Sequence, residues 1–263
     1  MQEANNDNIL EVDNISYSVR EKNIIEDISF QLEKGGFYSV IGTNGSGKTT
    51  LLRCISNSIQ PRKGTIKVNN KLINKYIPKL LARNISVVSQ HSEFLFDFSS
   101  FQVVMMGRMP YQKLLQTDSE KDMIIVEECM KKTNTFHLKD RSIKQLSGGE
   151  LQRVMIARAL AQQTPIILLD EPVSSLDIHH QFEIMELLTK INKENNTTIF
   201  IILHDLTLAL QYSDKTLALK EGKLAYFGKT REILTEENIE ELFNIKAEII
   251  DNKHIIIKHN EII

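Results

Sequence analysis

The segment Gly-Thr-Asn-Gly-Ser-Gly-Lys-Thr at residues 42–49 constrains the fold of this chain more than any other part of its sequence. It follows the apolar run 37–41, which predicts a buried strand, and a helix is expected to begin near Thr49. The segment matches the phosphate-binding pattern G-x-x-x-x-G-K-[ST], in which glycines let backbone N–H groups converge on phosphate oxygens. The N-terminus of the following helix adds positive potential. This order of strand, loop and helix predicts an α/β domain that binds a nucleotide.

The last residues of the loop have individual chemical roles. Lys48 supplies a positive charge to the β- and γ-phosphates, and the Thr49 hydroxyl is placed to bind Mg²⁺. An ordinary glycine turn is the alternative, but it does not account for the strand before the loop and the helix after it. The loop alone leaves GTPases, kinases and many other ATPases open. The residues expected to hold the nucleotide are Gly42, Thr43, Asn44, Gly45, Ser46, Gly47, Lys48, Thr49 and Thr50.

The rest of the chain predicts an α/β core with an antiparallel β region before the loop and an inserted helical subdomain after it. Apolar and polar residues alternate in the manner of strands between residues 10 and 32. Apolar runs at 165–170 and 198–203 flank a helical stretch at 181–192, which indicates parallel strands with crossover helices. Residues 93–160 are instead rich in helix formers, and we expect them to form the helical subdomain.

Composition narrows the classes of function. The chain has 263 residues, 41% hydrophobic and 25% charged, which fits one large globular domain. Its net charge of −2 gives no support to nucleic-acid binding. No apolar stretch approaches the roughly 18 to 20 residues that span a bilayer, and residues 1–8 lack the apolar core of a signal peptide. We therefore expect a cytoplasmic protein in which the isolated Cys54 and Cys129 are buried thiols.

Two adjacent carboxylates close the predicted strand 165–170. Asp170 suits a water-bridged partner of Mg²⁺ in nucleotide-hydrolysing enzymes with this loop. Glu171 suits a general base that polarises the attacking water. A solvated turn is the commoner explanation for an Asp-Glu pair, but not for a pair that ends such a strand downstream of a phosphate-binding loop.

A second segment with the properties of an anion site occupies residues 146–153, Leu-Ser-Gly-Gly-Glu-Leu-Gln-Arg. Ser147 can cap a helix that begins near Glu150, and Gly148 and Gly149 expose backbone N–H groups at its positive end. A plain capped helix would also have these features. The position of the segment, between the phosphate-binding loop and the strand that ends at Asp170, favours the anion site.

These motifs, in this order, resemble those of the ATP-binding-cassette (ABC) ATPases, and residues 146–153 resemble the signature motif of that family. The resemblance runs from about residue 9 to residue 250 and leaves 251–263 as a short C-terminal tail. It implies a P-loop NTPase core that binds ATP and Mg²⁺. It also implies that Gln90 senses Mg²⁺ and the attacking water, that His204 contacts the γ-phosphate, and that Asp177 lies in the loop that meets the opposite subunit.

In this family the signature residues bind the nucleotide held by the loop of another subunit. The resemblance therefore implies that Ser147, Gly148 and Gly149 act on a second copy of the chain, in a head-to-tail dimer that closes on two ATP molecules. Since no membrane span is fused to this chain, an integral-membrane permease is the second expected partner. An extracellular substrate-binding protein would act through that permease. The chain itself is then a peripheral subunit at the cytoplasmic face of the membrane.

One feature of the family is missing. Its members usually place an aromatic ring for adenine stacking on the second N-terminal strand, and the matching position here is Val19. Tyr17 lies two residues earlier, on the same face of a regular strand. Either Tyr17 stacks on the adenine or the base has only an aliphatic platform. A tyrosine that packs in the core is an equal alternative.

Residues 94–98 and 103–111 resemble the part of the family that receives a short helix from the permease. Adaptable side chains such as Met105 and Met106 suit that contact, although about half of these residues are expected to pack in the core. The second stretch, together with Leu-Asp-Ile-His-His-Gln at 176–181, resembles the importers of iron chelates (siderophores or haem) and of cobalamin.

Other assignments compete with this one. Manganese and zinc importers share part of the stretch 103–111. A soluble ABC ATPase of DNA repair or translation is expected to have long coiled coils or two cassettes, and a signalling GTPase an N-K-x-D motif; the sequence has none of these. The paired His179 and His180 suggest a metal site, but neighbours on a helix point in different directions, so we interpret them as surface or packing residues.

Overall fold

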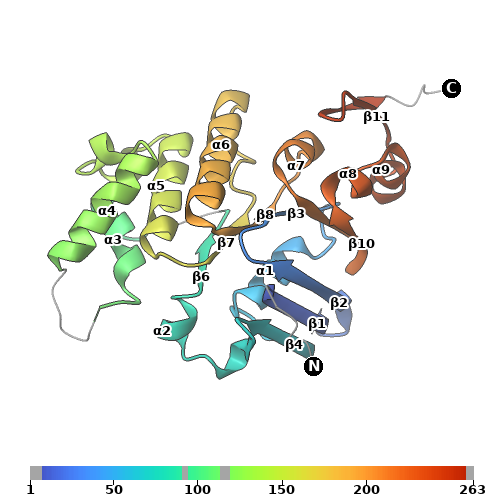
Figure 1. The fold of residues 1–263 in the computed structure, drawn as a ribbon, viewed down its shortest axis with the longest axis horizontal. Coiled ribbons are helices and arrows are strands. Elements are labelled where there is room, and N and C mark those ends of the chain that lie inside the picture. The colour runs from blue at the N-terminus through green and yellow to red at the C-terminus, as the bar shows by residue number, and fades with distance from the viewer. Residues whose placement is uncertain (1–7, 91–93, 113–118, 259–263) are drawn as a thin grey trace, which may run out of the picture.

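A six-stranded sheet forms the centre of the protein in the computed structural model, which describes residues 8–90, 94–112 and 119–258 (Figure 1). The strand order is β10-β9-β3-β8-β7-β6, and β6, β7, β8, β3 and β9 run parallel, while β10 pairs antiparallel with β9. The strands are β3 (Phe37–Gly42), β6 (Ile85–Val88), β7 (Ile166–Asp170), β8 (Thr198–Ile202), β9 (Lys215–Lys220) and β10 (Lys223–Lys229). The buried strand predicted at 37–41 and the parallel strands predicted at 165–170 and 198–203 are confirmed.

An antiparallel sheet of order β2-β1-β4-β5 covers one face of this central sheet, as the alternation between residues 10 and 32 predicted. Its strands are β1 (Asn8–Val19), β2 (Lys22–Glu33), β4 (Lys63–Val68) and β5 (Lys71–Leu72). Helix α1 (Lys48–Ile55) lies in the same layer, because Leu10, Ile28 and Leu51 belong to one buried cluster with Ile166 and Leu168 of β7.

Helices cover the opposite face. Ile167 and Leu169 of β7 point into this second cluster, whereas their neighbours in the strand point into the first, as the two-residue period of a strand requires. These helices are α3 (Ser100–Met105), α4 (Glu120–Lys132), α5 (Gly148–Ala161), α6 (Ile178–Asn195) and α7 (Leu206–Tyr212), whereas α2 (Pro78–Leu81) contributes Leu81 to the first cluster. The 3₁₀ turns are η1 (Ile73–Lys75), η2 (Met106–Arg108), η3 (Phe136–Leu138) and η4 (Ile143–Gln145). The helix predicted at 181–192 is α6.

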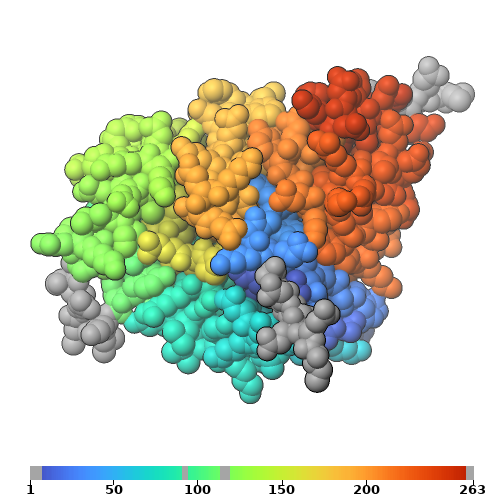
Figure 2. Space-filling view, in the orientation of Figure 1, coloured from blue at the N-terminus to red at the C-terminus, as the bar shows by residue number. Residues whose placement is uncertain are grey.

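Helices α3, α4 and α5 form the helical subdomain expected at 93–160; residues 93 and 113–118 lie outside the described part of the chain. In the space-filling view this part (green) abuts α6 (yellow-orange) as one continuous body (Figure 2). A Cβ on Gly107 would lie 2.3 Å from the backbone oxygen of Arg158, so η2 approaches α5 as closely as a glycine allows. The buried Arg108 donates from Nε to Asp122 of α4 at 2.8 Å and from Nη1 to the oxygen of Ala161 at 2.6 Å. Gly107 and Arg108 therefore hold η2 against α4 and the end of α5.

The C-terminal part consists of α8 (Thr230–Ile233), α9 (Glu236–Phe243) and a two-stranded ribbon of β11 (Lys246–Ile250) and β12 (His254–Lys258). The boundary expected at residue 250 falls between the two paired strands of this ribbon. Residues 259–263 of the expected tail lie outside the described residues. No helix within the described ranges is long and apolar enough to cross a membrane.

Both cysteines are buried free thiols, as predicted. Cys54 lies on α1, behind the phosphate-binding loop, and Cys129 lies on α4 of the helical subdomain. Burial raises the pKa of each thiol to about 11. Neither thiol is ionised to a significant extent at neutral pH.

Candidate functional site

The loop 42–49 joins the end of β3 to the start of α1, as its position after an apolar run predicted. Gly47 is the N-cap residue of α1 and has φ 99°, a backbone conformation that residues with a side chain rarely adopt. A Cβ at this position would lie 2.6 Å from Cγ2 of Ile25. At Gly45 a Cβ would meet no atom within 4 Å, so the loop borders open space there. Gly47 thus allows the loop to pack closely against β2, whereas Gly45 leaves space beside the loop for a ligand.

A buried ammonium group lies inside this loop. Lys48 is only 6% exposed, and its Nζ donates to the backbone oxygens of Gly42 at 2.9 Å and Thr43 at 3.0 Å. Burial lowers the pKa of Lys48, while the Glu171 and Asp170 carboxylates oppose that shift. Because both direct acceptors are neutral carbonyls, the positive charge is available to an anion.

The surroundings of Lys48 fit a chain of phosphate groups. The hydroxyl of Ser46 is buried and has no hydrogen-bond partner within the described part of the chain. A cavity of about 540 Å³ borders the loop, lined by residues that include Asn44, Gly45, Lys48 and Thr49. A buried cation, an unpaired hydroxyl and an open glycine cradle together match what a nucleotide's phosphates require.

A hydroxyl and a carboxylate that suit Mg²⁺ lie at the far side of the loop. Thr49 Oγ1 donates to Asp170 Oδ1 at 3.2 Å, which joins the start of α1 to the end of β7. Burial raises the pKa of Asp170; the Thr49 hydrogen bond opposes the shift and the Glu171 charge adds to it. Both groups are oxygen ligands of the kind that Mg²⁺ prefers, next to the loop that would hold the phosphates.

Glu171 lies between side chains from two neighbouring strand ends. One carboxylate oxygen accepts from Gln90 Nε2 at 2.6 Å, and the other contacts His204 Nε2 at 2.5 Å. Gln90 follows β6, Glu171 follows β7, and His204 follows β8, so three adjacent parallel strands deliver them to one edge. The residues assigned to catalysis at three distant points of the sequence therefore lie together.

The arrangement leaves Glu171 free to act as a base. A carboxylate has about four lone-pair sites, so it can accept from Gln90, contact His204 and still bind a water. A second cavity, of about 600 Å³, is lined by all three side chains together with Asn44 of the loop and Ser174. The carboxylate thus faces a space that continues from the phosphate-binding loop.

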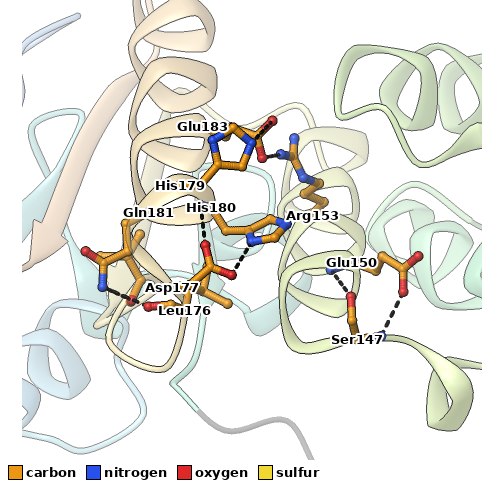
Figure 3. Close-up of polar contacts among 10 residues, drawn as sticks. Ser147, Glu150, Arg153, Leu176, Asp177, His179, His180, Gln181 and Glu183 are labelled. Carbon is orange, nitrogen blue, oxygen red and sulfur yellow. Dashed lines mark hydrogen bonds and ion pairs between the residues drawn. The ribbon is translucent and has the colours of Figure 1, made fainter.

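The residues of the signature segment lie apart from this cavity. Ser147 caps α5 in a capping box: its Oγ accepts from the Glu150 backbone N–H at 3.3 Å, and Glu150 Oε2 accepts from the Ser147 N–H at 2.8 Å (Figure 3). Asp177 caps α6 beside it. Among the described residues that line the two cavities near loop 42–49, Ser147, Gly148, Gly149 and Asp177 are all absent. One chain thus presents two separate candidate binding surfaces.

Neither residue considered for adenine stacking lines the cavity at the loop. Val19 is 51% exposed at the end of β1, and Tyr17 packs against the cluster beneath the antiparallel sheet. Among the described residues, those that line the cavity in this region are Lys22, Asn23, Ile24, Glu221 and Gly222. Glu221 and Gly222 form the turn between β9 and β10, and this turn lies against β2 because the Glu26 N–H donates to the Gly222 oxygen at 2.8 Å.

The stretch expected to meet a permease divides into core and surface. Val103, Val104 and Met105 are buried in the helix-side cluster, so the expected surface role of Met105 is wrong. Helix phase explains the error, because α3 turns these side chains toward α5. Met106 is half-buried. The exposed apolar side chains near this stretch are Ile77, Leu80, Leu95, Phe96 and Met109.

Comparisons with known proteins agree with this site. Residues 25–174 match the family described as "ABC transporter". The chain is 38% identical over 229 residues to the ferric enterobactin transport ATP-binding protein FepC of Escherichia coli, covering 87% of this chain and 84% of that one. It is 35% identical over 243 residues to the iron(3+)-hydroxamate import ATP-binding protein FhuC of Bacillus subtilis, covering 92% and 90%.

A solved structure of a metal-chelate type ABC transporter in an inward-facing conformation is similar over the whole chain. Its TM-score is 0.85 at 29% sequence identity, and the match covers 97% of this chain and 100% of that one. A solved dimeric ABC transporter cassette has a TM-score of 0.73 at 28% identity, covering 84% and 98%. By its family match, its relatives and its fold, the chain belongs to the ABC transporter family and is an ATP-hydrolysing member of it.

Proposed function

We propose that this chain powers the import of an iron chelate (a siderophore complex or haem) or of cobalamin through a separate membrane permease. The relatives with this role in their names, for ferric enterobactin and iron(3+)-hydroxamate, align along most of both chains. The chain would act as a peripheral subunit at the cytoplasmic face of the membrane. An extracellular binding protein would deliver the cargo to the permease.

The observation that carries the hydrolytic role is the position of Glu171, held between Gln90 and His204 beside the phosphate-binding loop. Glu171 takes the proton of a water whose oxygen attacks the γ-phosphorus of ATP. The bond from that phosphorus to the β–γ bridging oxygen breaks, and ADP and phosphate leave. Lys48 and the loop N–H groups hold the phosphates during this step.

Mg²⁺, when bound by the Thr49 hydroxyl and through water by Asp170, would neutralise charge on the phosphate oxygens. Gln90 and His204 orient the Glu171 carboxylate, and the same side chains line the cavity in which the attacked phosphate would lie. The three groups come from strands of one sheet, which fixes their distances before ATP arrives.

We propose a head-to-tail dimer as the working unit. Ser147, Gly148, Gly149 and Asp177 lie apart from the loop of their own chain, and a second copy would place them on its nucleotide. Ile178, next to Asp177, is 74% exposed, an apolar side chain that such a contact would cover. Dimeric cassettes among the solved relatives support this arrangement.

Uptake by a deletion strain tests the proposal. Loss of the chain is expected to abolish uptake of a ferric siderophore, haem or cobalamin and to leave manganese and zinc uptake intact. A plasmid copy of the wild type should restore uptake, and a Glu171→Gln copy should not. Loss of manganese or zinc uptake instead would show that the cargo is one of these metals. Unchanged uptake of all five substrates would favour a soluble ABC ATPase that does not act in transport.

A further inference from the structure

The N-termini of α5 and α6 lie in direct contact, although neither belongs to the cavity at the loop (Figure 3). A Cβ on Gly149 would lie 3.1 Å from Cδ2 and 3.6 Å from Nε2 of His180. A Cβ on Gly148 would lie 3.7 Å from a methyl of Leu176. The side chains 176 and 180 of the α6 start therefore pack on the two glycines of the signature segment.

The opposite edge of the His180 ring binds Asp177. Nδ1 lies 2.7 Å from Asp177 Oδ2, and the backbone N–H of His180 donates to Oδ1 at 3.0 Å. These two hydrogen bonds lower the pKa of the Asp177 carboxyl, so it is ionised at neutral pH and only accepts. Nδ1 is therefore the donor in this contact, and the ring has one edge on Asp177 and the other on Gly149.

The neighbouring His179 has a different environment. It is 78% exposed, and its Nε2 lies 3.5 Å from Glu183, one turn further along the same helix. Glu183 also forms an ion pair with Arg153 of α5, through its other oxygen (Figure 3). The two histidines thus differ in one respect that matters here: only His180 contacts both Gly149 and Asp177.

We propose that His180 is a positioning residue that locks the signature glycines and Asp177 into a single surface for the partner's nucleotide. Without its ring, Gly149 loses the neighbour on that side, and Asp177 keeps only the backbone hydrogen bond from residue 180. The two segments then approach the second subunit independently, and each must be ordered separately. This inference rests on the head-to-tail dimer proposed above.

The test compares His180→Ala with His179→Ala in the full-length chain carrying Glu171→Gln, so that ATP-bound dimers accumulate. Light scattering over a series of protein concentrations gives the dimer dissociation constant. We expect His180→Ala to raise that constant about tenfold, equivalent to about 1.4 kcal/mol, and His179→Ala to leave it unchanged. Fluorescent-ATP affinity of the monomer and the melting temperature should match the parent chain in both variants.

Two conservative variants separate positioning from simple stability. His180→Asn keeps a donor at the place of Nδ1, and His180→Phe keeps a ring against Gly149. Each is expected to give a dimer constant between those of the parent and of His180→Ala. Equal constants for His180→Ala and His179→Ala overturn the inference, as does a loss of monomer affinity or melting temperature that accounts for the effect. Failure of the parent chain to dimerise with ATP would instead overturn the proposed dimer itself.

Discussion

Glu171 has φ 50°, a backbone conformation that is uncommon for a residue with a Cβ. Such a conformation costs about 1–3 kcal/mol and persists only where its surroundings enforce it. Here β7 fixes the preceding residue, and a hydrogen bond from the Gln90 amide and a contact with the His204 ring hold the carboxylate. The strained turn aims the carboxylate at the cavity instead of at solvent.

The function of that carboxylate is tested by Glu171→Gln. The amide has nearly the same shape but cannot take a proton, so turnover should fall by at least about 100-fold. ATP affinity should be retained, and an ATP-bound dimer should accumulate. Phosphate release and light scattering measure the two effects. Glu194→Gln, at an exposed site on α6, is the matched control; hydrolysis that continues at the wild-type rate in Glu171→Gln would remove this residue from the base role.

Lys48→Ala is expected to weaken nucleotide binding itself. The substitution deletes a buried charge that faces phosphate, and contacts of this kind contribute about 1.5–3 kcal/mol each, or about 10- to 150-fold in affinity. Titration with a fluorescent ATP analogue gives the dissociation constant. Lys190→Ala, which removes an exposed lysine, should bind as the wild type does. Wild-type affinity in Lys48→Ala would contradict the assignment of the loop.

At the scale of elements, the sequence predicted what depends on local pattern. The loop 42–49, the strand that ends at Asp170 and the cap at Ser147 each follow from neighbouring residues, and the structure has all three. The sequence did not predict that Lys22, Asn23 and Ile24 line the cavity at the phosphate-binding loop, because their position there depends on a tertiary contact. The β9–β10 turn approaches β2 so closely that a Cβ on Gly222 would lie 2.6 Å from the Ile24 oxygen, and nothing local in either segment indicates this.

The buried Arg108 connects η2 to α4 and α5, and we expect its loss to destabilise the protein. Arg108→Met keeps much of the aliphatic bulk but leaves Asp122 without its cation and the Ala161 oxygen without its donor. Breaking a buried pair in this way costs about 3–5 kcal/mol. Thermal unfolding should show a large fall in melting temperature. The control Arg141→Met removes an arginine with a half-exposed side chain; equal melting temperatures for the two variants would show that the buried pair stabilises nothing.

At the scale of the molecule, the helical subdomain has an apolar surface beside α2. Arg83 Nε donates to the Pro110 oxygen at 2.9 Å, which holds the end of η2 next to α2 and leaves Ile77, Leu80 and Met109 exposed. Gln90 lies between the two parts of this surface in sequence, after Ile77 and Leu80 and before Met109. A permease helix that covers it would contact the same part of the chain that leads to the catalytic edge.

Met109→Glu is therefore expected to weaken co-purification with the permease and to reduce chelate uptake. An unpaired charge in an apolar contact must be desolvated, at a cost of several kcal/mol. The isolated chain should bind ATP as before, because Met109 lies outside both cavities near the loop. Ile257→Glu, on the C-terminal ribbon, is the control, since its side chain is exposed to a similar degree (60% against 63%). Equal loss of permease in both variants would remove this surface from the contact.

The slow reaction of the two buried thiols with alkylating reagents can be used to follow the protein's conformation. With pKa values of about 11, Cys54 and Cys129 react slowly with alkylating reagents at neutral pH while their helices stay folded. A cysteine introduced at an exposed position can therefore carry a spectroscopic probe without prior removal of the native ones. In turn, alkylation of Cys54, which is fully buried on α1, would reveal opening of the nucleotide-binding core.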